Sequence, residues 1–257
     1  TEAEAERDDP TIQILLDSIE KSNDQELYDG MPTAEEIEKV VRRQRSAAAP
    51  GSDNIQIDVF KYSDEALRYL VNLIQTVWIT GEVPEKMTNG LVTMIYKAKK
   101  QNDPRNYRPV CVTSCVYKVL TTLMYQKARH EIEEYLRESH YGARKDRRTM
   151  DAICTISTVI SEVMSENGMV IQANTNSNAE SEQQLQECKR RFLEYIDFQG
   201  AFDTVSHKKL LEALRDANVP NQILILVSNI YNQATIQAQL RTPAGHVLRS
   251  SPFRVRR

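Results

Sequence analysis

The sequence contains no long apolar run and no secretory signal pattern, and both absences narrow the class of protein. No apolar stretch in its 257 residues approaches the roughly 20 that a helix needs to cross a bilayer. The first ten residues, TEAEAERDDP, have neither a basic region nor an apolar core, so they do not resemble a signal peptide. We therefore expect an intracellular chain without a membrane partner, in the nucleus or the cytoplasm. Because the chain starts with Thr1 rather than Met, we also expect a fragment or a processed product.

Metal-binding cysteine patterns are missing as well. The four cysteines form no CxxC pair and have no histidine nearby at zinc-like spacing. We expect reduced thiols that lie mostly in the core, as is usual in an intracellular compartment. They are Cys111, Cys115, Cys154 and Cys188.

The net charge of −3 hides a strong asymmetry between the ends of the chain. Residues 1–38 carry 13 acidic and 2 basic side chains, whereas the rest carries 31 basic and 23 acidic side chains, a net charge of +8. A net positive charge over residues 39–257 is typical of a protein that binds an anionic partner such as nucleic acid. A solvated surface with uneven charge explains the same numbers equally well, and both interpretations stay open at this point.

Local signals predict helices and strands in an α+β order. Thr33 and Glu36 form a capping box that starts one helix, and Ser63 starts a second helix that ends at Gly81. A later helix begins near Met150 and is expected to end near Asn167-Gly168. The remaining predicted elements are strands at 91–97 and 192–196, helices at 114–136 and 206–217, a helix opened by Pro220, and a hairpin at 234–251.

The stretch FLEYIDFQGAFDTVSH contains two acids after an apolar run. Residues 192–196 lead to Asp197, and Asp203 follows six residues later. A carboxylate at the end of a buried strand is well placed to hold a divalent metal, because the strand fixes it and the following turn opens to solvent. Taken alone, a strand followed by an Asp-containing turn is the simpler interpretation.

Two basic segments suit phosphate groups. The segment 95–114 places several cations, Lys97 and Arg108 among them, around a turn that follows a strand, an arrangement suited to gripping a triphosphate. The segment 140–149 has a glycine followed by four cations just before a helix, which suits a phosphate backbone. A solvated basic face is at least as good an explanation for Lys99, Lys100, Arg105, Arg147 and Arg148.

These segments occur together, in order, with several others. From Ala49 to the C-terminus the chain resembles the reverse transcriptase domain of non-LTR (LINE-type) retrotransposons, which are transposable elements. Each piece alone is weak, but seven in the family's order are specific. The pieces are APGSDN, EVPEKM, IYK, NYRPVCVTS, YKVL, YGARKDRRTMDAI and DFQGAFDTVSH.

The resemblance implies a helix-rich α+β fold of the right-hand polymerase type, with fingers and an incomplete palm. The C-terminal palm strands and the thumb are expected to be absent from this chain. The stretch 170–189 is polar and is predicted to be a mobile insertion. The implied organisation is an acidic linker and helix at 1–45, a fingers-like region at 46–169, the insertion at 170–189, and the first part of the palm at 190–257.

The resemblance also implies roles for individual residues. Asp197 corresponds to the first metal-binding aspartate of the palm, shared by two Mg²⁺ ions in the intact enzyme, and Phe198 would lend its backbone carbonyl to a metal. Phe202 corresponds to an aromatic gate that excludes a 2′-hydroxyl, with an ordinary core phenylalanine as the alternative. The nucleotide-binding set is Lys97, Arg108, Gly200, Ala201 and Phe202, the template-contact set is Arg144 and Arg147, and Asp203 is a structural acid that braces the turn.

The implied function is that of a fragment of a reverse transcriptase, an RNA-directed DNA polymerase and nucleotidyltransferase. Its partners would be an RNA template, a DNA primer and dNTPs, with an endonuclease domain upstream in the intact element. The family has paired palm aspartates after this point, and no such pair follows Asp197 here. We therefore expect this chain alone to be inactive, so whether it is itself an enzyme stays open. The alternatives are a non-catalytic nucleic-acid-binding remnant of a retroelement and a pseudogene product without function.

Overall fold

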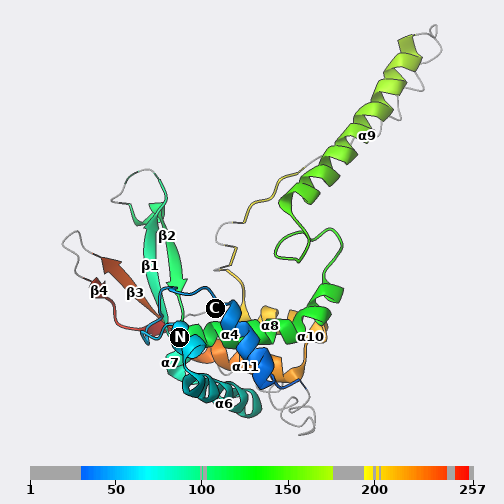
Figure 1. Cartoon of the computed structure of the whole chain (residues 1–257). Coiled ribbons are helices and arrows are strands. Elements are labelled where there is room, and N and C mark those ends of the chain that lie inside the picture. The colour runs from blue at the N-terminus through cyan, green and yellow to red at the C-terminus, as the bar shows by residue number, and fades with distance from the viewer. Residues whose placement is uncertain are drawn as a thin grey trace. The chain divides into compact units, whose positions relative to one another are not determined.

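The computed structural model describes residues 30–98, 100, 103–175, 194–198, 201–202, 204–241 and 247–254 (Figure 1). The chain forms two compact units. One comprises residues 1–132 together with 204–257, and the other comprises residues 133–203. We call them the first and second unit.

Helix α4 (Ala34–Arg43) begins where the capping box predicts. The Thr33 hydroxyl accepts from the Glu36 amide at 3.2 Å, and the Glu36 carboxylate accepts from the Thr33 amide at 2.9 Å. The capping box therefore satisfies two of the amide groups that have no partner within the helix, those of Thr33 and Glu36. The helix buries Ile37, Val40 and Val41, which share one face.

Helix α6 (Asp64–Thr80) also has the predicted ends. Ser63 accepts from the Ala66 amide at 3.2 Å, and Gly81 ends the helix in the left-handed region at φ 70°. The short helices α5 (Asp58–Tyr62) and α7 (Glu85–Thr88) lie on either side of it in the chain, and their brief apolar patterns did not predict them.

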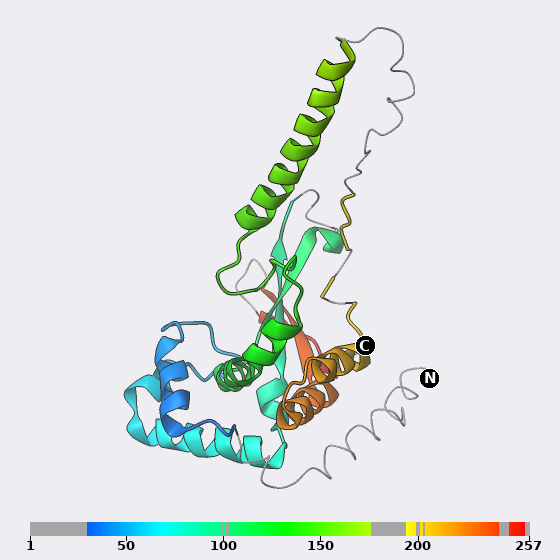
Figure 2. The same ribbon diagram turned by 90° about the vertical axis from the view of Figure 1, so that its right-hand side faces the viewer.

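The core of the first unit is helical. Helices α8 (Cys115–Tyr135), α10 (His207–Asp216) and α11 (Asn221–Gln233) join α4 and α6 there, and α10 and α11 lie side by side (Figure 2). The helix opened by Pro220 is confirmed, with the proline as the residue before the first turn. Each fully buried leucine contributes about 2 kcal/mol. The leucines with no exposed surface are Leu70, Leu120, Leu123 and Leu226.

One mixed sheet carries the strands of the first unit, in the order β2-β1-β3-β4 (Figure 1). Strand β1 (Gly90–Tyr96) pairs antiparallel with β2 (Tyr107–Val112) and parallel with β3 (Thr235–Arg241). The predicted hairpin is confirmed as β3 with β4 (Val247–Arg249), and β5 (Phe253–Arg254) also pairs with β3. A helix-rich α+β fold is therefore observed, while the division into fingers and palm stays a prediction.

The second unit corrects one helix boundary. Helix α9 spans Thr149–Thr175, so it continues past Asn167-Gly168, where we expected it to end. A glycine inside a helix costs about 1 kcal/mol relative to alanine, which a long helix tolerates. Residues 170–175 of the predicted insertion are thus helical, and residues 176–189 lie outside the described part of the chain.

An ion pair fastens α4 to α8 and gives a pH-dependent contribution to stability. The ammonium of Lys127 donates to both carboxylate oxygens of Glu36, at 2.8 and 2.9 Å. Burial raises the pKa of Glu36, but the hydrogen bonds from Lys127 and from the Thr33 amide, with nearby positive charge, outweigh it and hold the pKa below 4.5. The charged form is therefore favoured by folding.

The stabilisation from Glu36 should be present above pH 4.5 and should be lost as the pH falls through the lower pKa of the folded state. We expect Glu36→Gln to remove part of the acid sensitivity, by at most about 1 kcal/mol because the pair is partly exposed. Urea unfolding from pH 3 to pH 7, followed by fluorescence of the single tryptophan, the buried Trp78, measures this. Glu35→Gln, at a neighbouring position in the same helix turn, is the matched control. Identical pH profiles for Glu36→Gln and the unaltered chain would contradict the assignment.

Candidate functional site

The β1–β2 hairpin brings Lys97 and Arg108 onto one face. Arg108 pairs with Ile95, and the Lys97 amide extends the ladder by donating to the Asn106 carbonyl at 2.9 Å. Cross-strand partners face the same side and successive residues alternate, so Lys97 and Arg108 are diagonal neighbours. Both are exposed, and neither side chain has a partner among the described residues. Two free cations on one hairpin face can bind an anion such as a phosphate.

The other basic residues of this segment differ from that pair. Arg105 forms a two-pronged ion pair with Asp103, at 2.9 and 3.0 Å, and this contact holds the pKa of Asp103 low. Arg105 is therefore already engaged by a carboxylate, although its side chain remains exposed. Lys100 is exposed, and Lys99 lies outside the described residues. On the opposite face of the hairpin, the rings of Tyr96 and Tyr107 lie 5.5 Å apart.

The APGSDN motif holds the end of β2 against the start of α8. The Ser114 hydroxyl donates to the Asp53 carboxylate at 2.7 Å and accepts from the Val116 amide at 3.2 Å in the first turn of α8. Gly51 lies so close to the backbone of Thr113 and Ser114 that any Cβ would lie 2.6 to 2.9 Å from three of its atoms. The motif therefore has a structural role, which its position in the sequence did not reveal.

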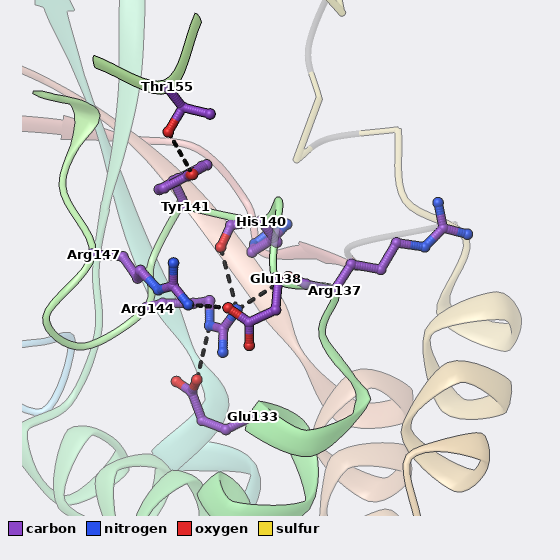
Figure 3. Close-up of polar contacts among 8 residues, drawn as sticks. All are labelled: Glu133, Arg137, Glu138, His140, Tyr141, Arg144, Arg147 and Thr155. Carbon is purple, nitrogen blue, oxygen red and sulfur yellow. Dashed lines mark hydrogen bonds and ion pairs between the residues drawn. The ribbon is translucent and has the colours of Figure 1, made fainter. Parts of the chain in front are cut away.

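The second unit folds the predicted template-contact residues into a loop that joins α8 to α9. We call residues 136–148 the Arg144 loop (Figure 3). The Arg144 guanidinium donates to Glu133 at 2.8 Å and to the backbone carbonyls of Arg137 and His140 at 3.1 and 3.5 Å. The Arg144 side chain is 9% exposed. It binds the end of α8, where the helix dipole favours a cation.

Arg147 is also engaged within this loop. It forms an ion pair with Glu138 and lies over the Tyr141 ring at 5.6 Å from the centroid. The Tyr141 hydroxyl is 3.0 Å from the Thr155 hydroxyl of α9 (Figure 3). Side-chain contacts therefore hold the loop to the end of α8 through Glu133 and to α9 through Thr155.

The start of α9 explains another part of the YGARKDRRTMDAI motif. The Asp151 carboxylate accepts from the Arg148 backbone amide at 2.7 Å, so it caps the first turn of the helix. An acid in the first turn is also favoured by the helix dipole. This contact uses the Arg148 backbone only, and the Arg148 side chain is exposed.

The described segment 194–198 is not a strand, so the strand predicted at 192–196 is wrong for residues 194–196, and residues 192–193 lie outside the described part of the chain. Residues 194–198 have no regular structure, and all five are exposed. Tyr195 is 82% exposed and Ile196 is 71% exposed. A strand needs a neighbour for its amide and carbonyl groups. No described residue pairs with this segment.

The other described residues of this motif are exposed. Phe202 is 96% exposed, so it is not a core side chain here, and Ala201 is exposed as well. Gly200 and Asp203, two of the predicted site residues, lie outside the described residues. The roles that the resemblance implies for these positions stay predictions.

A divalent metal would find too few ligands in the part of the chain that the structure describes. It holds no group of three or more His, Cys, Asp or Glu side chains that could bind a metal. Mg²⁺ takes six oxygen ligands, usually one or two carboxylates with substrate phosphates and water. Asp197 with the Phe198 carbonyl therefore does not make a complete site.

The cysteines correct another expectation. Cys115 is buried, but Cys111 and Cys154 are exposed, so "mostly in the core" is wrong for the three described thiols, all of which are free. Burial, aided by the charge of Asp53, raises the pKa of Cys115 to about 11. That thiol is therefore unreactive near neutral pH.

Comparisons with known proteins agree with one another. A family model described as reverse transcriptase (RNA-dependent DNA polymerase) matches residues 97–255. A retrovirus-related Pol polyprotein from type-1 retrotransposable element R2 of Nasonia vitripennis is 20% identical over 216 residues, 84% of this chain and 18% of that protein. An RNA-directed DNA polymerase from mobile element jockey of Drosophila funebris is 23% identical over 200 residues, 76% of this chain and 20% of that protein. The chain thus spans about a fifth of the length of these relatives.

Within the described residues, no helix is long and apolar enough to cross a membrane.

Proposed function

The chain belongs to the reverse transcriptase family, and from that premise we propose that it is a fragment of the RNA-directed DNA polymerase of a LINE-type retrotransposon. The family match over residues 97–255 carries this proposal. The similarity to polymerases of the R2 and jockey elements supports the non-LTR class. Reverse transcriptases use divalent metal ions, an RNA template and nucleotide substrates. We also propose that the intact protein extends a DNA primer and contains an endonuclease domain.

Lys97 and Arg108 are proposed to hold the phosphates of the incoming nucleotide. Their exposure, their common face and the lack of a side-chain partner among the described residues support this role. Lysine supplies a compact charge, whereas arginine offers a planar fork of donors that matches two phosphate oxygens. Binding by this pair would fix the triphosphate while leaving the base free to pair with a template.

Asp197 is proposed as one ligand of a two-Mg²⁺ site, with the Phe198 backbone carbonyl as another. The described residues hold no group of three or more acidic, histidine or cysteine side chains that could bind a metal, which is fewer ligands than such a site needs. The other acidic ligands in this proposal come from outside the described residues. The same proposal gives roles to the next residues of the motif. The backbone amides near Gly200 and Ala201 would face the triphosphate. Phe202 would exclude a 2′-hydroxyl, and Asp203 would brace the turn.

Primer extension tests the proposal. A longer protein of the same element that includes this chain should extend a DNA primer on an RNA template with Mg²⁺ and dNTPs. The 257-residue chain should give no extension, since its described residues hold no group of three or more side chains that could bind a metal. Failure of the longer protein to extend the primer, or extension by the short chain that Asp197→Asn abolishes, would contradict the proposal.

The second candidate function is a non-catalytic nucleic-acid-binding module. The net charge of +8 over residues 39–257 and the exposed Lys97 and Arg108 favour it. The same assay separates the two functions. RNA retention without extension by any longer protein of the element would support the binding module.

A further inference from the structure

The Arg144 loop contains five cations that fall into two groups. Arg144 and Arg147 are held by carboxylates within the second unit. The other three are exposed, and they are Arg137, Lys145 and Arg148. The difference matters because a cation that is already paired must give up its partner before it can bind a phosphate.

Arg144 is the more tightly held of the two paired arginines. Its three contacts are all with the segment from Glu133 to His140, and Figure 3 shows its guanidinium directed toward that segment. The Arg137 carbonyl that it contacts also accepts from the His140 amide at 2.9 Å. Arg144 thus reinforces a turn that the backbone already makes. A phosphate could reach it only by breaking a mostly buried ion pair.

The backbone of the loop needs such support. Ala143 and Asp146 have φ values of 57° and 60°, in the left-handed region. That region is unfavourable for residues with a Cβ and persists where other contacts hold it. Arg144 lies between these two residues, so its contacts fix the part of the loop that is most strained.

The exposed cations are better placed for an external partner. Figure 3 shows the Arg137 side chain extending away from the contacts of Arg144. Lys145 has one loose ion pair with Asp146 at 3.9 Å, and the Arg148 side chain has no partner among the described residues. Each keeps most of its charge available for a phosphate oxygen.

We propose that Arg144 is a positioning residue, and that Arg137, Lys145 and Arg148 contact the phosphates of the RNA backbone. This inference rests on the proposed function, because it takes RNA as the partner. It assigns the predicted template contact to the neighbours of Arg144 and gives Arg144 the task of shaping the loop that presents them. Arg147 supports the same shape through Glu138 and Tyr141.

Substitution of Glu133 distinguishes a positioning role of Arg144 from direct contact of Arg144 with phosphate. If Arg144 bound phosphate itself, Glu133→Ala would free it from a competing carboxylate, and RNA affinity would stay equal or rise. If Arg144 positions the loop, Glu133→Ala should weaken RNA binding as Arg144→Ala does. Glu162→Ala removes the same charge from an exposed position on α9 and is the matched control.

The experiment measures binding of the 257-residue chain to single-stranded RNA across a range of salt concentrations. Each lost phosphate contact lowers the salt slope by about 0.7, which is about fivefold in affinity at 0.1 M salt. Lys145→Ala and Arg148→Ala should each show that change. Arg144→Ala and Glu133→Ala should each lower the RNA affinity by more than fivefold and the salt slope by more than 0.7, because three phosphate contacts depend on the loop.

Hydrogen exchange gives the second readout. Amides 137–148 should exchange faster in Arg144→Ala and Glu133→Ala but not in Lys145→Ala, while the helices of the first unit stay protected. Unchanged or tighter RNA binding by Glu133→Ala would overturn the inference, as would unchanged binding by Lys145→Ala and Arg148→Ala together, or no RNA binding by the unaltered chain. Primer extension by the longer protein tests the proposed function separately from all these outcomes.

Discussion

Gly51→Ala is expected to lower the free energy of unfolding of the first unit by about 3 kcal/mol, at the upper end of the range for overpacked sites. The added Cβ would lie 2.6 Å from the Ser114 amide nitrogen, 2.7 Å from its Cα and 2.9 Å from the Thr113 carbonyl carbon. These backbone atoms cannot easily move, because the preceding residues pair with β1 and the following ones begin α8. Urea unfolding followed by Trp78 fluorescence measures the loss.

Gly90 provides a contrast that identifies the cause. A Cβ at Gly90 would overlap the Cys111 sulfur, which is a side-chain atom. The damage from Gly90→Ala should therefore be partly repaired by adding Cys111→Ala. The damage from Gly51→Ala should not be repaired by adding Ser114→Gly, because the backbone atoms remain. Repair of both, or of neither, would contradict the steric explanation.

Gly142→Ala is the matched control within the family motifs. Its Cβ would meet one atom of His140 at 3.9 Å, which is ordinary contact. We expect a change within about 0.5 kcal/mol, as for most substitutions that disturb no packing. A large effect here would show that glycine matters in these motifs for reasons other than close approach.

Sequence patterns predicted the elements whose signals are local. The caps at Thr33 and Ser63 and the left-handed Gly81 each act on amides or carbonyls within four residues. The hairpin of β3 and β4 is equally local, because only five residues separate its strands in the sequence. Such features depend on neighbours that the sequence displays directly.

The features that sequence reasoning missed depend on distant partners. The parallel pairing of β1 with β3 joins Gly90 to Ile236, far apart in the chain, and no local pattern encodes it. The strand predicted at 192–196 was wrong for residues 194–196 because it also depended on a distant partner. Its apolar residues fit a strand, but strand formation requires a second strand beside it. The role of Gly51 was missed because its crowding comes from Thr113 and Ser114.

For the candidate site, the sequence identified the basic residues but not the contacts that they make. The resemblance identified Lys97 and Arg108, and the strand register places them on one face. It also identified Arg144, but the charge of a residue in a motif does not say whether a carboxylate such as Glu133 already holds it. The pairing of Arg105 with Asp103 could have been suspected, since the two lie two residues apart beside a turn.

Asp197→Asn in the longer polymerase is expected to slow primer extension by about 10³-fold or more, which corresponds to roughly 4 kcal/mol of transition-state stabilisation. Asparagine keeps the shape of aspartate but lacks the negative charge that holds a divalent cation against water. Glu194→Gln removes an exposed carboxylate from the same segment and should leave the rate unchanged. RNA affinity should be equal in both variants, because neither residue belongs to the basic groups. Normal extension by Asp197→Asn would exclude Asp197 as a metal ligand.

This effect requires that residues 194–198 take up a different structure in the longer protein. In this chain Tyr195, Ile196 and Phe198 leave most of their apolar surface in water, which is unfavourable by about 25 cal/mol for each Å². Pairing with a strand from elsewhere in the polymerase would bury that surface and fix the Asp197 carboxylate at the strand end. Slower hydrogen exchange of these amides in the longer protein than in the 257-residue chain is the expected sign. Equal exchange in both would leave Asp197 on a loose segment, unable to hold an ion in one position.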